Sequence, residues 1–202
     1  MNSEELEIKL YVRDLARVEQ SLRDLGALLI EPRAHEMNLR FDLPDGSLRA
    51  GQRVLRLRQS GDARLTYKGP EQDRDGMKAR AEIEFTVGDF EAARKFLAAL
   101  GYVEAAVYEK FRATYELGAA RVMLDELPYG DFVEIEGTDA SSIRALAARL
   151  KLNAEAAIPA GYLALFERLC AEQMLVPARL TFESLRRLRV TPEMLHVRPA
   201  EA

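Results

Sequence analysis

The chain is poor in the residues that build disulfides and zinc sites. Its 202 residues include one cysteine, Cys170, and two histidines, His35 and His196, which stand far apart. A single cysteine excludes an intramolecular disulfide and is typical of a reducing compartment. Two isolated histidines lack the ligand spacing of a zinc site. With 48% hydrophobic residues, the chain is nevertheless long enough for one domain with a substantial core.

Long apolar runs are also missing. No stretch approaches the ~20 apolar residues that a membrane helix needs, and the first residues do not resemble a signal peptide. A formal net charge of −4 argues against a nucleic-acid-binding surface as the main function. These features predict a soluble, cytoplasmic protein, with neither a membrane nor a nucleic acid as its partner.

What the chain does have is six short stretches in which apolar residues alternate with charged ones. Because side chains alternate across a strand with period two, each stretch would form a strand with one charged face and one apolar face. The stretches are residues 5–10, 54–58, 65–68, 80–85, 110–114 and 132–136.

Amphipathic helix patterns lie between these strands. Asp14 and Asp89 are suitable N-caps for the first two helices, and Gly26 and Gly101 are suitable stop signals. These two segments are related by a constant offset of 75 residues, which predicts two strand–helix–strand halves. The expected helices span residues 15–25, 90–100, 141–150 and 161–173.

Charges of the same sign recur two residues apart on the predicted strands, as in Glu5 with Glu7 and Arg56 with Arg58. Two such residues stand about 6–7 Å apart on one face, so each pair costs on the order of 2–3 kcal/mol at an effective dielectric near 20. A single strand of this kind is most simply a half-exposed edge with its charges in water. For the whole set, a ligand of opposite sign explains the pattern better, with internal salt bridges as the alternative.

The helices need apolar partners, which the apolar strand faces supply. If the helices cover the outside, the charged faces point inward. The predicted fold class is therefore α+β: an antiparallel β-barrel that forms a tunnel, with a charged lumen and helices packed on the outside. The candidate lumen carboxylates are Glu5, Glu7, Glu82, Glu84, Asp125, Glu134 and Glu136, and the candidate cations are Lys9, Arg56, Arg58, Lys68, Arg80, Lys110 and Arg112.

This set of side chains suits a particular ligand. Arginine and lysine at such density match a polyanion, because arginine binds phosphate oxygens bidentately. Clustered carboxylates without histidines suit a hard divalent cation, Mg²⁺ or Mn²⁺, held by oxygen ligands. A polyphosphate that carries a metal ion would satisfy both sets at once.

The residues also resemble a known family. Glu5-Leu6-Glu7-Ile8-Lys9 is similar to the Glu-x-Glu-x-Lys signature of the CYTH proteins, also called triphosphate tunnel metalloenzymes. The resemblance extends over about residues 4–170, and Lys68-Gly69-Pro70 and Gly130-Asp131-Phe132 are most similar to class IV adenylate cyclases. The further matching segments are Leu-Arg-Leu-Arg at 55–58, Tyr-Lys-Gly-Pro at 67–70, Glu-Ile-Glu at 82–84, Glu-Lys-Phe-Arg at 109–112, Asp125, and Gly-Asp-Phe-Val-Glu-Ile-Glu at 130–136.

The resemblance implies roles for the charged residues. Glu5, Lys9 and Lys68 would be catalytic. The triphosphate would be bound by Lys9, Arg56, Arg58, Lys68, Arg80, Lys110 and Arg112, and the metal by Glu5, Glu7, Asp125, Glu134 and Glu136.

The domain limits follow from the same comparison. A tunnel domain would span residues 1–172. Residues 173–202 would form a C-terminal extension with a basic helix over about 180–190 and a tail, which could pack on the domain or bridge two subunits of a homodimer.

The implied activity is metal-dependent chemistry on a triphosphate. The motif similarity favours a class IV adenylate cyclase, which converts ATP to cyclic AMP and pyrophosphate. The alternative is a triphosphatase that hydrolyses inorganic triphosphate, thiamine triphosphate or a nucleoside triphosphate, and a second alternative is a non-catalytic polyphosphate- or nucleotide-binding module. In one departure from the family, Arg40 stands where many members carry a tyrosine. This departure weakens any route in which a tyrosine and a lysine jointly activate the attacking water.

Overall fold

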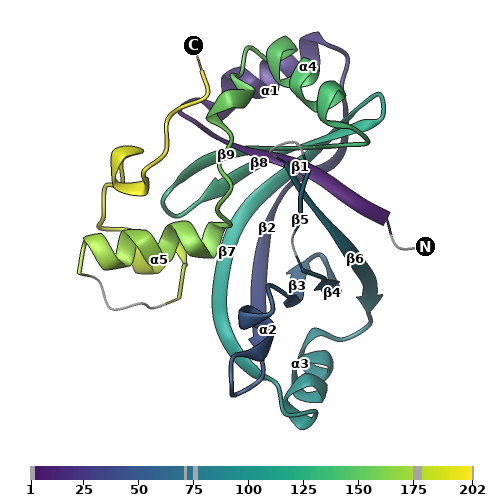
Figure 1. The fold of residues 1–202 in the computed structure, drawn as a ribbon, viewed down its shortest axis with the longest axis vertical. Coiled ribbons are helices and arrows are strands. Elements are labelled where there is room, and N and C mark those ends of the chain that lie inside the picture. Colours follow the sequence, from purple (N-terminus) through teal and green to yellow (C-terminus); the bar gives the residue numbers. More distant parts are fainter. Residues whose placement is uncertain (1–2, 71, 75–76, 175–178, 202) are drawn as a thin grey trace.

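The computed structural model describes residues 3–70, 72–74, 77–174 and 179–201, and side chains over 6–70, 81–174 and 179–201. Its strands form one antiparallel sheet in the order β1-β9-β8-β7-β2-β3-β4-β6-β5, and β1 also pairs with β6. This pairing joins the ends of an eight-stranded ring, so the predicted antiparallel barrel with external helices is confirmed (Figure 1). The strands are β1 (Ser3–Val12), β2 (Leu28–Asp42), β3 (Val54–Ser60), β4 (Asp62–Lys68), β5 (Gln72–Arg74), β6 (Met77–Val87), β7 (Val103–Leu117), β8 (Ala120–Leu127) and β9 (Gly130–Gly137).

The barrel is built from two similar halves. Helix α1 (Leu15–Asp24) joins β1 to β2, and helix α3 (Phe90–Ala99) joins β6 to β7. Adding 75 to the bounds of α1 and β2 gives the bounds of α3 and β7, as the repeat predicted. Asp14 and Asp89 cap the two helices by accepting from the backbone N–H groups three residues on.

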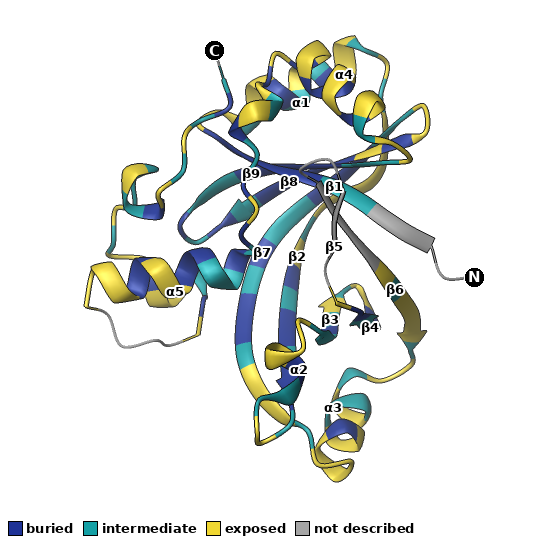
Figure 2. Cartoon of the chain, viewed as in Figure 1, coloured by how far each residue is buried: buried dark blue, intermediate teal, exposed yellow. Residues whose placement is uncertain are grey.

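The core lies between the outer face of the barrel and the helices that cover it. Helix α4 (Ala140–Arg149) packs with α1 over β9 and β1, where Leu10, Val133 and Ile135 are fully buried. Figure 2 shows that the outward surfaces of these helices are mostly exposed. Because side chains alternate along a strand, Glu134 points to the lumen between the outward-facing Val133 and Ile135. The alternation that predicted the strands thus also sets which residues reach the lumen.

One part of the lumen is filled by aromatic side chains beside helix α5 (Tyr162–Glu172). Phe132 makes edge-to-face contacts with Tyr11 and Tyr162, at ring-centroid distances of 5.4 and 5.2 Å. The Tyr129 hydroxyl donates to the backbone oxygen of Tyr162 at 2.8 Å. These contacts fix the first turn of α5 against the inner wall of the barrel.

The C-terminal extension packs against β7 and against the aromatic cluster beside α5, and its structure differs from the prediction. Only residues Phe182–Leu185 form a helix (α6), where a helix over about 180–190 was expected. Leu180 instead donates its N–H to the Val107 oxygen of β7 and accepts from the Glu109 N–H, which holds it extended. Near the end of the chain, Ala200 donates its N–H to the oxygen of Tyr11. Backbone pairing with the barrel therefore overrides the local helix pattern.

The packing of the extension can be tested at Leu180, which is 0% exposed. Leu180→Ala should lower the free energy of unfolding by about 2–5 kcal/mol, because it leaves a cavity beside β7. Chemical denaturation of the full chain measures this loss. The matched control is Leu28→Ala, whose side chain is 66% exposed and should cost less than about 0.5 kcal/mol. Equal losses in the two variants would mean that the extension does not pack on the barrel.

A second prediction concerns Asp131, at the start of β9, which stands directly opposite Glu126 of β8. Burial raises the pKa of Asp131 from 3.8 to about 6, and the charges of Glu126 and Asp14 add to the rise. Folding therefore takes up a proton between these two pKa values, and stability present at pH 4 is lost as the pH passes 6. After a discount for partial exposure, Asp131→Asn should stabilise the protein by about 1 kcal/mol at pH 7.

The gain from Asp131→Asn should shrink as the pH falls and vanish below about pH 3, where the wild-type carboxyl is protonated in both the folded and the unfolded states. Thermal melts from pH 4 to pH 8 measure the difference between the two proteins. A gain that is constant across this range would contradict the assignment to the Asp131 carboxyl.

Candidate active site

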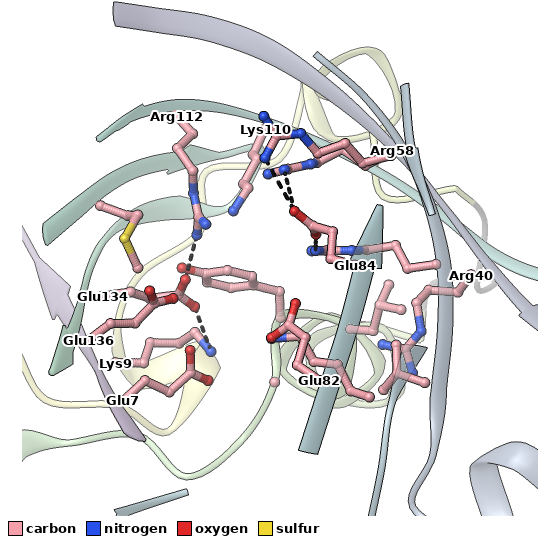
Figure 3. A pocket seen from close by; sticks show the side chains of 18 of the residues that line it. Glu7, Lys9, Arg40, Arg58, Glu82, Glu84, Lys110, Arg112, Glu134 and Glu136 are labelled. Carbon is pink, nitrogen blue, oxygen red and sulfur yellow. Dashed lines mark hydrogen bonds and ion pairs between the residues drawn. The ribbon is translucent and has the colours of Figure 1, made fainter. Parts of the chain in front are cut away.

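The lumen holds a cavity of about 1510 Å³ that is lined by residues of the barrel strands, α2 (Ser47–Ala50) and α5. Figure 3 shows acidic and basic side chains pointing into it from facing walls. Two predicted residues, Glu5 and Arg80, have side chains outside the described residues, and Asp125 lies behind the lining. The predicted residues that line the cavity are Lys9, Arg56, Arg58, Lys68, Lys110 and Arg112, together with Glu7, Glu82, Glu84, Glu134 and Glu136.

One ionic chain links β1, β9 and β7. The Lys9 ammonium lies 3.1 Å from Glu134, whose other oxygen accepts a hydrogen bond from Arg112 (Figure 3). Burial alone would raise the pKa of Glu134, but Lys9 and Arg112 outweigh it and hold this pKa well below its usual range. Burial would also lower the pKa of Lys9, but the Glu134 charge raises it on balance. Both groups are therefore charged at neutral pH.

Asp125 on β8 is the centre of a second cluster. Its carboxylate is 0% exposed and accepts hydrogen bonds from Lys110 at 3.0 Å, from Arg112 Nε at 2.6 Å and from the Tyr162 hydroxyl at 2.7 Å. The two cations face the cavity, whereas Asp125 lies behind them. Asp125 thus positions the cations in this structure.

Glu36 on β2 has a similar place and was missed in the sequence. It is buried, with Arg58 at 3.1 Å and Lys110 at 3.7 Å. Burial would raise the pKa of Glu36, but Lys110, Arg112 and Arg58 together lower it to about 2. The alternation of Glu36, Asn38 and Arg40 with Met37, Leu39 and Phe41 is the signal that would have placed it on the lumen face.

The arginines of β3 share another carboxylate, Glu84 on β6. It lies 3.6 Å from both Arg56 and Arg58 and accepts a hydrogen bond from Thr66 at 2.7 Å. The neighbouring Glu82 pairs instead with Lys68, at 2.8 Å. The predicted like-charge pairs of β3 and β6 therefore have opposite charges on nearby strands. These cross-strand neighbours stand closer to each pair than the two like charges stand to each other along one strand, so attraction outweighs repulsion. Internal salt bridges account for part of the pattern that was attributed to a ligand.

A different arrangement holds for Glu7 and Glu136. They stand directly opposite each other in the β1–β9 register, and both line the cavity. Like charges in this position repel, unless a cation lies between them. Among the described residues, no three acidic, histidine or cysteine side chains converge closely enough to hold a metal by themselves. The pair still fits Mg²⁺, which is usually held by one or two carboxylates together with substrate phosphates and water.

Tyr162 and Tyr108 add aromatic surface to the site. The Lys9 ammonium lies 4.3 Å from the centre of the Tyr162 ring, within range of a cation–π contact. Tyr108 lines the cavity from β7. Burial would raise the pKa of Tyr108, but Arg56, Lys110 and Arg40 lower it on balance. Arg40, which was not among the predicted cations, also lines the cavity, from the lumen face of β2.

The sequence of this chain matches the model of a known protein family. The CYTH domain model matches residues 3–161. The chain belongs to the CYTH family. Comparison with curated proteins gives no match. The family match runs from the start of β1 to just beyond α4, and it includes every predicted site residue.

Several solved structures have a fold similar to that of this chain. A candidate adenylate cyclase from Vibrio parahaemolyticus is 19% identical, with a TM-score of 0.74, and the match covers 83% of this chain and 99% of the other. The PH1012 protein of Pyrococcus horikoshii is 27% identical, with a TM-score of 0.68, over 79% and 98%. A Hippeastrum protein, a candidate adenylyl cyclase with a dominant triphosphatase activity, is 18% identical, with a TM-score of 0.55, over 96% and 100%.

Two of these likenesses, at 19% and 18% identity, concern the fold alone. Of the helices in the described ranges, none combines the length and the apolarity needed to cross a lipid bilayer.

Proposed function

We propose that this CYTH protein is a divalent-metal-dependent enzyme that acts on a triphosphate, and that its reaction is the conversion of ATP to cyclic AMP and pyrophosphate. The observation that carries the proposal is the cavity wall itself. The six predicted lysine and arginine side chains come from four strands and line one cavity together with the Glu7 and Glu136 carboxylates. A triphosphate chain with a bound cation complements both walls.

The cations would bind the phosphate chain. Lys110 and Arg112 are held by Asp125, and Arg58 by Glu36, so their charges are fixed before the substrate arrives. Preorganised charges of this kind stabilise the charge that develops in phosphoryl transfer without further reorganisation. Lys9 of β1 and Lys68 of β4 also line the cavity, each beside a glutamate. They are suited to neutralise the oxygens of the transferred or leaving phosphate group.

The metal ligands are proposed to be Glu7, Glu134 and Glu136, with Glu5 and Asp125 as the further members that the family resemblance implies. Glu7 and Glu136 are the strongest members, because they face each other on the lumen surface. Mg²⁺ or Mn²⁺ would supply Lewis-acid polarisation of the phosphate oxygens. Asp125 is the weakest, because its oxygens already accept from Lys110, Arg112 and Tyr162.

In the cyclase reaction, the 3′-hydroxyl oxygen forms a bond to the α-phosphorus while the bond to pyrophosphate breaks, and the hydroxyl proton is lost. In the triphosphatase reaction, the water oxygen forms a bond to the γ-phosphorus while the bond from that phosphorus to the β-phosphate oxygen breaks, so the diphosphate is the leaving group and orthophosphate is the other product. The motif similarity to class IV adenylate cyclases favours the first reaction. The triphosphatase remains the second candidate because of the dominant triphosphatase activity of the structurally similar Hippeastrum protein.

One incubation tests the proposal. The full chain is incubated with ATP and Mg²⁺ or Mn²⁺, and in parallel with tripolyphosphate and thiamine triphosphate, and the products are identified. Cyclic AMP with pyrophosphate supports the cyclase, whereas ADP or pyrophosphate with orthophosphate supports the triphosphatase. If none of the three compounds is turned over but one binds tightly, the protein is a binding module and the enzymatic proposal is wrong.

A further inference from the structure

Several buried polar atoms without a hydrogen-bond partner gather at one place in the barrel wall. Among the described side chains, five buried nitrogen or oxygen atoms lack such a partner. Four of the five belong to three residues of β2 and β3. They are Glu36 Oε2, Asn38 Nδ2, Asn38 Oδ1 and Arg56 Nε.

The register of the sheet places these residues together on the lumen face. Asn38 stands directly between Arg58 of β3 and Tyr108 of β7, and Glu36 stands directly opposite Lys110 of β7. Arg56 precedes Arg58 by two residues and lies on the same face of β3. The three residues that carry the orphan atoms are therefore neighbours within one small area of the wall.

This area lies behind the surface that would contact a substrate. Arg56, Arg58, Lys110 and Tyr108 line the cavity, whereas Glu36 and Asn38 are buried beneath them. Asn38 is 0% exposed although both polar atoms of its side chain are unpaired. A buried amide without hydrogen-bond partners lowers the stability of the folded state, unless a small molecule completes its hydrogen bonds.

The donor and acceptor character of these four unpaired atoms determines which small molecule could bind them. Glu36 Oε2 and Asn38 Oδ1 are acceptors, and Asn38 Nδ2 and Arg56 Nε are donors. Two donors and two acceptors match a water molecule, which itself donates twice and accepts twice. A cation would be repelled by Arg56, Arg58 and Lys110. An anion would be repelled by the Glu36 carboxylate, which is ionised at neutral pH because the surrounding cations lower its pKa.

We propose that Glu36, Asn38 and Arg56 bind ordered water behind the phosphate-binding arginines, and that Asn38 is a positioning residue for substrate binding. Through this water, Asn38 would fix the Arg56 guanidinium and the Glu36 carboxylate, which in turn holds Arg58 and Lys110. The orientation of three cavity cations would thus depend on an amide that never contacts the substrate. This role rests on the proposed function, whereas the water site itself does not.

The test uses Asn38→Leu, which keeps the size of the side chain and removes both polar atoms. If the amide binds water, the variant should melt several degrees lower and should bind metal-free tripolyphosphate about tenfold more weakly by calorimetry. Asn38→Ser, which retains a hydroxyl and leaves room for a second water, should recover most of that affinity. The control is Met37→Leu, on the opposite face of β2, which should change neither quantity.

An Asn38→Leu variant that is as stable as the wild type or more so, with unchanged tripolyphosphate affinity, would overturn the inference, since an unhydrated amide gains from apolar replacement. If Asn38→Leu fails to fold, the tripolyphosphate affinity of Asn38→Ser decides. An affinity close to that of the wild type supports the inference, and a lost affinity refutes it. A crystal structure of the wild type provides an independent readout. Water bonded to Glu36 and Asn38 supports the site, and direct bonds between these side chains refute it. If the enzyme proposal fails, melting temperatures and crystallography still report on the water.

Discussion

Glu7→Gln should abolish metal-dependent turnover of the triphosphate while leaving the fold intact. The carboxylate stands opposite Glu136 in the β1–β9 register and faces the cavity, where Mg²⁺ or Mn²⁺ would compensate the repulsion of the pair. Loss of one of the charged metal ligands should lower kcat/KM by about 100-fold or more. Steady-state rates measured against the metal-ion concentration detect this loss.

The same variant should not lose stability in the absence of metal. Neutralising Glu7 removes its repulsion of Glu136 and also its attraction for Lys9, so the melting temperature with a chelator should change little. The matched control is Glu91→Gln on α3, whose side chain lies on the helix surface beside Arg94. It should retain full activity and metal dependence. Full activity in Glu7→Gln would refute the assignment of Glu7 to the metal site.

Asp125→Asn should destabilise the protein even when no metal is present. The Asp125 carboxylate is fully buried and is bonded to Lys110, Arg112 and Tyr162. Removing its charge leaves two buried cations less well compensated, which typically costs about 3–5 kcal/mol. For a chain of this length, that cost corresponds to a fall of roughly 10 °C in the melting temperature. Thermal melts in a chelator measure it directly.

This experiment separates two roles for Asp125. The family resemblance implies that it is a metal ligand, whereas the structure places it behind the cations as their support. If the melting temperature in chelator is unchanged and only the stabilisation by added Mg²⁺ is lost, Asp125 acts as a ligand. Tyr162→Phe is a useful partner variant, since it removes one bond to Asp125 and no charge. It should cost about 1–2 kcal/mol by the same measurement.

Much of the fold could be predicted because it depends on local patterns. The alternation at residues 132–136 predicted β9, and it also predicted that Glu134 faces inward between Val133 and Ile135. Capping by Asp14 and Asp89 and the offset of 75 residues predicted two equivalent strand–helix–strand units. The helix over about 180–190 was wrong, because the backbone of Leu180 pairs with β7 from a distant part of the chain. No local pattern near Leu180 reports that partner.

In the cavity, too, the sequence predicted which residues are present but not how they are paired. Six of the seven predicted cations have described side chains, and all six line the lumen. The pairing of these charges could not be predicted, since it depends on which strands become neighbours and in which register. Glu82 and Glu84 look like one carboxylate pair in sequence, but Glu82 binds Lys68 and Glu84 binds the arginines of β3. The alternation in β2 could have placed Glu36 and Asn38 on the lumen face, but it could not show that Glu36 pairs with Arg58 and Lys110.

The sequence by itself determined the strands, the helices, the inward and outward faces and the identity of the charges, because period two, period 3.6 and capping are properties of a short segment. Only the tertiary structure decided which carboxylate supports which cation, that Asp125 lies behind the wall while Glu7 faces Glu136, and where the C-terminal extension packs. These features are set by closure of the barrel. Closure brings β1 to β6 and β7 to β2, and so joins residues that no local interaction along the chain could pair.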